Sequence, residues 1–307
     1  MKKKVLILGG GISKERLVSL ETAKSVFNEL KKNNYDVIIC EPDLNLIKNI
    51  KNFKPSVVFN ALHGQFGEDG YIQSILESQN IKYTHSGVLA SSLAMDKEIS
   101  KKIYLKNKIL TPKYIKFKFN INNTIDKKIK QLVDKKLKFP VVIKPINEGS
   151  SVNVYICNKK NFITNLKKMT SYKEILIEEF IGGREIQVAI MGKIKLGAIE
   201  LKPKREFYDY KAKYNENAKT EHIIPVKISK KDLTKVMSIA LKAHNLIGCR
   251  GVTRSDFKFF KGKFFLLETN TQPGMTKLSL VPEIARYKNM QFIDLIEWIL
   301  KDASTNR

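Results

Sequence analysis

The stretch GVTRSDFKFFKGKFFLLETN, residues 251–270, decides the fold of the last third of this chain. Aromatic and aliphatic residues flank a central Lys-Gly-Lys, a pattern that predicts a β-hairpin with a short glycine-containing turn. If the turn centres on that glycine, Asp256 lies opposite Glu268 and Arg254 lies opposite Asn270. Because side chains alternate between the two faces of a strand, we expect all four on one face of the sheet.

The two acids of this hairpin predict a cation site. Directly opposed residues have Cβ atoms roughly 4.5 to 5.5 Å apart, and two carboxylates at that distance repel each other. Oxygens of Asp256, Glu268 and Asn270 would leave coordination positions for water and phosphate, an arrangement that Mg²⁺ prefers. The simpler alternative is a solvated acidic pair on an exposed sheet face, and a register slip of one residue would put the pairs on opposite faces.

A tight loop follows the hairpin directly. Pro273 and Gly274 predict a sharp turn, and glycine lets backbone N–H groups approach an anion closely. Such donors beside Arg254 could stabilise a developing oxyanion.

A second candidate site lies in residues 140–152, PVVIKPINEGSSV. Lys144 ends an apolar strand, and the following Gly-Ser-Ser is similar to a phosphate-cradling loop with a point charge at its mouth, although it is not a Walker sequence. Further on, Glu178 in the apolar segment 175–181 could bring an acid and backbone groups against a nucleotide base. Taken alone, a lysine or glutamate at a strand end is more often a solvated surface residue.

The first third of the chain alternates short apolar runs with helical patterns. The expected strands are 5–8, 37–40, 57–60 and 81–84, and the expected helices are 19–32 and 71–78. This alternation predicts a parallel, doubly wound sheet, whose ligands bind beyond the carboxyl ends of its strands. Two polar loops there contain Glu15 and His63. Glu15 is alternatively an ordinary acid at a helix start, and a lone loop histidine is often structural.

The pattern changes near Lys97, and two further units are expected. A lysine-rich helix at 97–106, a surface helix ending near 133 and strands at 140–145 and 175–180 predict a smaller α+β unit. A third unit begins near Arg184 with two strands, a polar segment at 203–220 and a helix from Ser229, its N-cap, to Gly248. The expected divisions are therefore 1–96, 97–183 and 184–307.

The amino-acid composition limits which classes of protein the chain can belong to. The chain has 307 residues, is 43% hydrophobic and has 56 Lys and Arg against 30 Asp and Glu, for a formal charge of +26. The excess is mostly lysine spread along the chain without an arginine-rich stripe, so we interpret it as solvated faces and attraction of anionic nucleotides. No apolar run approaches the ~20 residues of a membrane span, and the apolar stretch 5–8 is too brief for the core of a signal peptide, so no secretory signal is expected. Three scattered cysteines indicate a reducing compartment, so a cytoplasmic location is expected.

Together these segments resemble the D-alanine:D-alanine ligase family of ATP-grasp enzymes over essentially the whole chain. Each motif is short, but their number and order make the joint resemblance strong. The matching pieces are GGGxSxExxVS at 9–19, LHG at 62–64, GEDG at 67–70, MDK at 95–97, KP at 144–145, EGSS at 148–151, FYDYKAKY at 207–214, RxD at 254–256 and ExNTxPGMT at 268–276.

The resemblance implies a three-domain ATP-grasp fold and a two-step reaction. ATP phosphorylates the carboxylate of one D-alanine, and the amine of a second D-alanine then attacks the acyl phosphate. The product, D-alanyl-D-alanine, serves peptidoglycan precursor synthesis. The three expected divisions become a substrate-binding domain, a nucleotide-binding subdomain and a C-terminal subdomain with the metal site and a lid at 203–220.

The resemblance also implies a role for particular residues. Two Mg²⁺ ions, for which Mn²⁺ can substitute, would be held by Asp256, Glu268 and Asn270. The nucleotide residues would be Lys97, Lys144, Ser151, Glu178, Phe180, Ile181, Glu185, Phe207 and Lys213. Substrate binding is assigned to His63, Ser279 and Leu280, and catalysis to Glu15, Ser150, Tyr214, Arg254 and Gly274.

The chain departs only mildly from the family pattern, and two alternative functions remain. Ser255 and Thr269 stand where the family usually has apolar residues, Gln272 is in a variable place, and all chemistry is expected to be intact. The partners expected are ATP and D-alanine, with neither nucleic acid nor membrane, in a homodimer as is frequent in the family. One alternative is a relative that joins D-alanine to D-lactate or D-serine, against which Tyr214 argues. The other is a non-catalytic basic protein that binds nucleotides or RNA.

Overall fold

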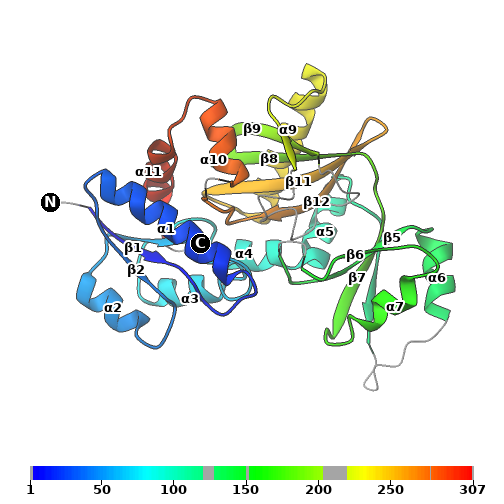
Figure 1. The fold of residues 1–307 in the computed structure, drawn as a ribbon, viewed down its shortest axis with the longest axis horizontal. Coiled ribbons are helices and arrows are strands. Elements are labelled where there is room, and N and C mark those ends of the chain that lie inside the picture. The colour runs from blue at the N-terminus through cyan, green and yellow to red at the C-terminus, as the bar shows by residue number, and fades with distance from the viewer. Residues whose placement is uncertain (1–2, 120–127, 150–151, 203–219, 277, 306–307) are drawn as a thin grey trace.

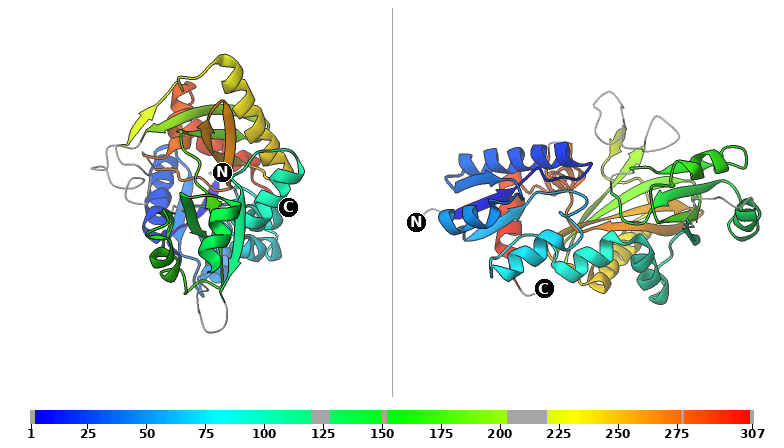
Figure 2. Two further views of the ribbon diagram at one scale, coloured as in Figure 1. Left: turned by 90° about the vertical axis from the view of Figure 1, so that its right-hand side faces the viewer. Right: turned by 90° about the horizontal axis from the view of Figure 1, so that it is seen from below.

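The computed structural model describes residues 3–119, 128–149, 152–202, 220–276 and 278–305. Three separate sheets organise the chain, as Figure 1 shows. The N-terminal sheet lies beside the C-terminal helices, the smallest unit lies at the opposite end, and the third sheet lies between them (Figures 1 and 2).

The N-terminal sheet is parallel and covered on both faces, which confirms the predicted fold class. Its strands are β1 (Lys4–Leu8), β2 (Asp36–Cys40) and β3 (Val57–Asn60), in the order β2-β1-β3. Val5 and Ile7 pack against α1 (Arg16–Lys32) and α11 (Phe292–Asp302), whereas Leu6 and Leu8 pack against α2 (Leu46–Phe53) and α3 (Tyr71–Ser78). Successive residues of β1 therefore pack into two different hydrophobic cores, one on each face of the sheet.

The prediction of a full strand at 81–84 is wrong. Tyr83 forms only isolated bridges, parallel to Val58 and antiparallel to Ser304. The guanidinium of Arg250 donates to the carbonyls of both Tyr83 (3.0 Å) and Ser304 (2.9 Å). Side-chain bonds from a distant segment thus replace part of the ladder, and this edge attaches the end of the described chain to the N-terminal sheet.

A four-stranded antiparallel sheet forms the smaller unit. Its order is β4 (Tyr114–Lys118), β7 (Glu174–Glu179), β5 (Val141–Pro145) and β6 (Tyr155–Cys157). Helices α6 (Lys128–Lys136) and α7 (Phe162–Lys167) bury Val133 and Phe162 against its apolar face. The two central strands match the predicted ones. The edge strands β4 and β6 were missed because one alternates with lysines and the other has three residues.

A five-stranded antiparallel sheet carries the hairpin. Its order is β10 (Glu221–Ile223), β9 (Ile194–Lys202), β8 (Arg184–Met191), β11 (Val252–Phe260) and β12 (Lys263–Asn270). Helix α9 (Lys230–Ile247) covers one face and begins as predicted, with the Ser229 hydroxyl accepting the Asp232 N–H at 3.0 Å. Gly248 follows with φ +79°, the left-handed conformation that glycine adopts without strain. Helix α10 (Leu280–Tyr287) packs against β9 and α11.

Helices α4 (Val88–Met95) and α5 (Lys97–Lys106) lie beneath this five-stranded sheet (Figure 2). Ala94 and Tyr104 share one core cluster with Phe257 and Leu266 of the hairpin. The division at residue 97 therefore falls between two helices with a common core, and the three-part division stays a prediction. Over the described ranges, the helices are all too short or too polar to cross a membrane.

We expect Ser229→Ala to lower the free energy of unfolding by about 1 kcal/mol, because the first turn of α9 loses the acceptor of one N–H group. Urea titration of the purified protein measures this loss. Ser78→Ala, at an exposed helix end, is the control and should change stability by less than about 0.5 kcal/mol. Equal effects of the two substitutions would contradict a capping role for Ser229.

Candidate functional site

A β-bulge sets the register of the β11–β12 hairpin at the site. Lys261 (φ +47°) and Gly262 (φ +71°) form a two-residue turn between Phe260 and Lys263, a register that by itself would pair Asp256 with Leu267. The register shifts by one residue between Phe257 and Asp256, so Asp256 pairs with Glu268 and Arg254 with Asn270. The predicted pairs are confirmed, but the turn does not centre on Gly262.

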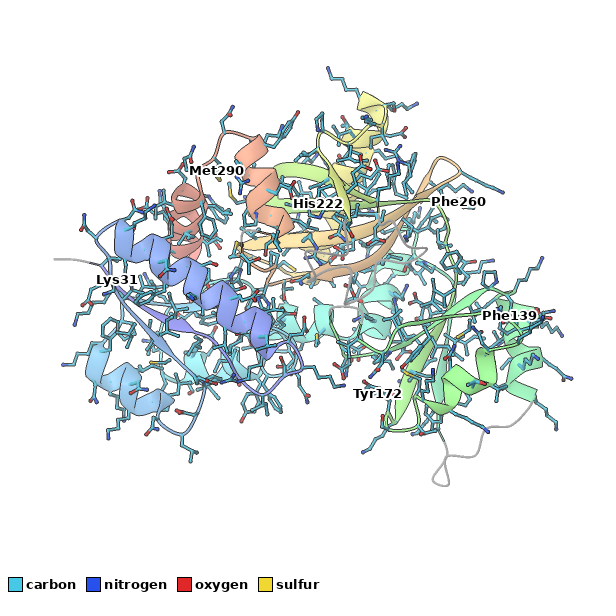
Figure 3. All side chains as sticks on the ribbon, in the orientation of Figure 1. Lys31, Phe139, Tyr172, His222, Phe260 and Met290 are labelled. Atoms are coloured by element: carbon cyan, nitrogen blue, oxygen red, sulfur yellow. The ribbon has the colours of Figure 1, made fainter. Side chains whose placement is uncertain are left out.

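The bulge also decides which face Glu268 occupies. Phe264 and Leu266 are buried in the core beneath the sheet, and strict alternation would send Glu268 to the same apolar face. The extra residue, Leu267, reverses the alternation and brings Glu268 to the face of Asp256. Figure 3 marks Phe260 at the turn end of the hairpin, away from the N-terminal unit, so the acids lie toward the centre of the molecule.

Cationic side chains lie beside both acids. Arg254 binds Asp256 in a bidentate pair, with Nε 2.8 Å from Oδ1 and Nη2 3.1 Å from Oδ2. Lys97 Nζ lies 3.3 Å from Glu268 Oε2 and donates to the Glu148 carbonyl at 2.5 Å. The positive charge that the opposed carboxylates require is therefore supplied in part by the protein itself.

The donor set fits a hard divalent cation. Asp256, Glu268 and Asn270 offer oxygen ligands from one sheet face, as Mg²⁺ prefers. Asn270 Oδ1 already accepts the Gln272 N–H at 2.7 Å, which fixes its direction and leaves it a second lone pair. Within the part of the chain that the structure describes, His, Cys, Asp and Glu side chains form no three-membered metal cluster.

Two adjoining cavities meet at these acids. Lys97 and Glu268 line both cavities. The first cavity is also lined by Glu15, His63, Glu68, Gln187, Arg254, Asn270, Gly274, Ser279 and Leu280. The second is also lined by Lys144, Glu148, Glu178, Phe180, Ile181, Glu185, Asp256 and Lys258. The two cavities therefore adjoin at Glu268 of the hairpin.

In the first cavity His63 is held from both ring nitrogens. Its Nδ1 lies 3.0 Å from Glu68 Oε1 and its Nε2 lies 3.1 Å from Thr22 Oγ1, with all three side chains buried. Burial raises the pKa of Glu68, and the contact with His63 opposes that rise. The Ser13 hydroxyl donates to the His63 carbonyl at 2.5 Å, so the backbone of this loop is fixed as well.

Glu15 sits between two glycines of different units. A Cβ atom added to Gly64 would lie 2.7 Å from Glu15 Oε2, and one added to Gly149 would lie 2.6 Å from the same oxygen. Both glycines therefore allow the close approach of backbone to a carboxylate. Glu148 attaches the loop before Gly149 to the N-terminal unit by accepting from Lys14 Nζ (2.6 Å). Within the smaller unit, Glu148 also accepts from the Tyr172 hydroxyl (2.9 Å).

The loop after the hairpin faces His63. A Cβ added to Gly274 would lie 2.9 Å from Ser279 Oγ and 3.9 Å from His63 Nε2. Ser279 precedes α10 and its hydroxyl accepts the Thr276 N–H at 2.9 Å, while Leu280 is the first helical residue. The N–H groups of the first helical turn are suited to a carboxylate. Gln272 ties this loop to the N-terminal unit by donating to the Leu62 carbonyl.

The second cavity contains a buried cluster of charges. Glu178 Oε2 lies 2.9 Å from Lys144 Nζ, and its Oε1 lies 3.0 Å from the ammonium of Lys101. Burial raises the pKa of Glu178, but the two ammonium groups outweigh burial, and its pKa lies below the ordinary value. The carboxylate is therefore ionised at neutral pH. Across the cavity Lys258 Nζ lies 2.9 Å from Glu185 Oε2, and Gln187 donates to Glu185 Oε1 at 3.3 Å.

Ser255 and Thr269 face away from the metal acids, as alternation predicts. Their hydroxyl oxygens are 3.1 Å apart, and the Tyr104 hydroxyl donates to Thr269 at 2.9 Å. All three side chains are buried, so a small polar network replaces apolar packing beneath the site.

Sequence reasoning missed five residues of this site: Glu68, Lys101, Gln187, Lys258 and Gln272. Two could have been found by extending the alternation, because Lys258 is two residues beyond Asp256 and Gln187 is two beyond Glu185. Lys101 is one helical turn beyond Lys97. Five predicted residues, Ser150, Ser151, Phe207, Lys213 and Tyr214, lie outside the described residues, and their roles stay predictions.

Comparisons with known proteins find similarity along essentially the whole chain. A family model described as "D-ala D-ala ligase C-terminus" matches residues 104–301. The D-alanine–D-alanine ligase of Pelagibacter ubique is 70% identical over 307 residues, which is all of both chains. That of Zymomonas mobilis is 42% identical over 98% of this chain and 94% of its own. A crystal structure of D-alanine–D-alanine ligase from Bacillus anthracis complexed with ATP superposes with TM-score 0.84 at 31% identity, covering 98% of this chain and 97% of that one.

We expect the buried His85, whose ring edge packs on Phe59, to make the fold sensitive to acid. Burial, together with the charges of His63 and Arg250, lowers the pKa of His85 from 6.5 to about 3. Below about pH 6.5 the unfolded chain therefore binds one more proton than the folded one, so the free energy of unfolding falls as the pH falls.

His85→Asn removes this titratable group, and asparagine tolerates the φ of +67° at this position. Between pH 6 and 4 the slope of unfolding free energy against pH should decrease by up to about 1.4 kcal/mol per pH unit. Urea titrations at several pH values measure both slopes. A variant with the slope of the parent protein would contradict a neutral His85 in the folded state.

Proposed function

The chain belongs to the D-alanine–D-alanine ligase family, and from this premise we propose how its two cavities divide the work of an ATP-dependent ligase. The enzyme joins two D-alanines into D-alanyl-D-alanine, for peptidoglycan precursor synthesis, with release of ADP and phosphate. The observation that carries the proposal is the position of Lys97 and Glu268, which line both cavities. A phosphoryl group can pass there from the nucleotide cavity to the amino-acid cavity.

The second cavity takes ATP. Lys144 lines this cavity and Lys97 lines both cavities, so their two ammonium groups would bind the phosphates. Phe180 and Ile181 at the end of β7 would hold the adenine with Glu178, and Glu185, oriented by Lys258 and Gln187, would accept from the ribose hydroxyls. By sequence, Ser151, Phe207 and Lys213 belong to the same site.

Asp256, Glu268 and Asn270 would hold two Mg²⁺ ions, or Mn²⁺ in their place. When bound, the metal neutralises negative charge on the phosphate oxygens during transfer. The protein contributes positioning: the bulge directs Glu268, Gln272 directs Asn270, and Arg254 directs Asp256. Phosphoryl transfer depends on such positioning and charge neutralisation rather than on a protein nucleophile.

The first cavity takes the two amino acids. Glu15 and His63 would bind the amine and the carboxylate of the first D-alanine, whose carboxylate oxygen attacks the γ-phosphorus as ADP leaves. The first turn of α10, at Ser279 and Leu280, would bind the carboxylate of the second D-alanine. Its amine then attacks the acyl carbon and phosphate departs. Arg254 and the Gly274 N–H would stabilise the oxyanion of that step, while Ser150 and Tyr214 are assigned by sequence alone.

The setting of the enzyme follows from the same reasoning. Free cysteines and the use of ATP favour a cytoplasmic location. A homodimer is proposed from the family resemblance, and no nucleic-acid or membrane partner is proposed. The high lysine content would raise the local concentration of anionic nucleotides.

We expect Asp256→Asn and Glu268→Gln each to lower D-alanine-dependent phosphate release by about a hundredfold or more, because each removes one charged oxygen ligand. A coupled phosphate assay with ATP, Mg²⁺ and D-alanine measures the rate, and circular dichroism checks the fold. Asp134→Asn, which breaks an exposed pair with Lys159, is the control and should retain the rate of the parent protein. Retained turnover in either site variant would contradict the metal assignment.

The identity of the second substrate has its own test. Because Tyr214 favours D-alanine, we expect dipeptide as the main product at neutral pH when D-alanine competes with D-lactate and D-serine. Mass spectrometry of the products measures the ratio. Preferential formation of depsipeptide or of D-alanyl-D-serine would overturn the choice of D-alanine, while leaving the ligase reaction itself in place.

A further inference from the structure

Helix α5 directs three polar side chains into the protein interior. Lys97, Lys101 and Tyr104 follow each other at spacings of four and three residues, so they lie on one face of the helix. Lys97 reaches Glu268 and Tyr104 reaches Thr269, both on β12. Lys101 lies between them, is fully buried, and has no place in the reaction described above. Because an ammonium group is almost never fully buried without partners, its contacts call for an explanation.

The ion-pair partner of Lys101, Glu178, lines the nucleotide cavity. Its Nζ lies 3.0 Å from Glu178 Oε1 and donates to Thr111 Oγ1 at 2.5 Å, and the Tyr114 ring centroid is 5.8 Å away. Glu178 uses its other oxygen for Lys144 Nζ at 2.9 Å. One carboxylate thus bridges two ammonium groups, of which only Lys144 lines the cavity.

The strand register explains this bridge. Val142 on β5 pairs with Glu178 on β7, and Lys144 is two residues along β5, so Lys144 and Glu178 are diagonal neighbours on one face of the sheet. Helix α5 supplies the second ammonium from outside the sheet. Burial lowers the pKa of Lys101 to about 8, while attraction to Glu178 opposes that effect, so Lys101 is still mainly charged at neutral pH.

We propose that Lys101 is a positioning residue for the nucleotide, which acts through Glu178 on Lys144. This inference rests on the proposed function of the cavity. Lys101 holds Oε1 of Glu178 and shares its negative charge, which keeps the carboxylate directed into the cavity and leaves the Lys144 ammonium available to phosphate oxygens. Without Lys101, the whole charge of a buried carboxylate would act on Lys144 and would hold that ammonium against Glu178.

The alternative role for Lys101 is that of a counter-charge that only stabilises the fold. The two roles differ in what they change. A positioning role raises the KM for ATP and leaves the KM for D-alanine and kcat nearly as they were, since Glu178 and Lys144 line the second cavity and not the first. A merely stabilising role lowers the thermal unfolding temperature, while the folded molecules keep the KM for ATP of the parent protein.

The test compares Lys101→Met, Glu178→Gln and the double variant in steady-state kinetics, with thermal unfolding measured on the same samples. We expect Lys101→Met to raise the KM for ATP about tenfold, comparable to the loss of one hydrogen bond to a charged group. The KM for D-alanine and kcat should change by less than about twofold, within the usual scatter of such measurements. Lys102→Met is the matched control, since Lys102 is exposed on the same helix and pairs with Glu98. It should leave all three constants unchanged.

The double variant keeps the proposal testable if Lys101→Met does not fold, because it removes the buried acid together with its partner. If Lys101 acts only through Glu178, the double variant has the same KM for ATP as Glu178→Gln alone. A further rise in that KM would overturn the proposal, as would a wild-type KM for ATP in folded Lys101→Met. Failure of the proposed function is distinguishable, because the unmodified protein would then show no D-alanine-dependent phosphate release.

Discussion

The site depends on a single extra residue in strand β12. Leu267 interrupts the alternation of the hairpin, and this bulge turns Glu268 from the apolar core to the face that already carries Asp256. Two carboxylates on one face need positive charge, and the fold supplies it from Arg254 on β11 and from Lys97 at the start of α5. The position of α5 beneath the sheet is therefore part of the chemistry, because its first residue completes the junction between the two cavities.

Helix α5 connects the parts of the enzyme that have to act together. It shares a core with the hairpin through Tyr104, reaches the metal acid with Lys97 and reaches the acid of the nucleotide cavity with Lys101. A rigid helix with three such contacts fixes the distance between the acids of two different sheets. This matters for phosphoryl transfer, because the nucleotide and the acceptor carboxylate must be held in line.

Charge in this protein is arranged differently at the surface and at the site. Most of the lysines and arginines in the described ranges are exposed, and there they contribute little specific energy. At the site, by contrast, Lys97, Lys101 and Lys144 are buried beside carboxylates. Burial makes each of these contacts strong and also makes each charge costly to leave without its partner, so the site groups depend on one another.

The sequence alone determined the parallel N-terminal sheet, the two central strands of the smaller unit, the cap of α9 and the pairing of Asp256 with Glu268. These features follow from local periodicity, from capping residues and from a resemblance spread over short motifs. Only the tertiary structure decided that the pairing depends on a bulge, since strict alternation of the sequence from a two-residue turn would place Glu268 in the core. The tertiary structure alone also decided that Lys101, one of several lysines in a lysine-rich helix, is buried between units. Burial arises from contacts between segments that the sequence does not place together.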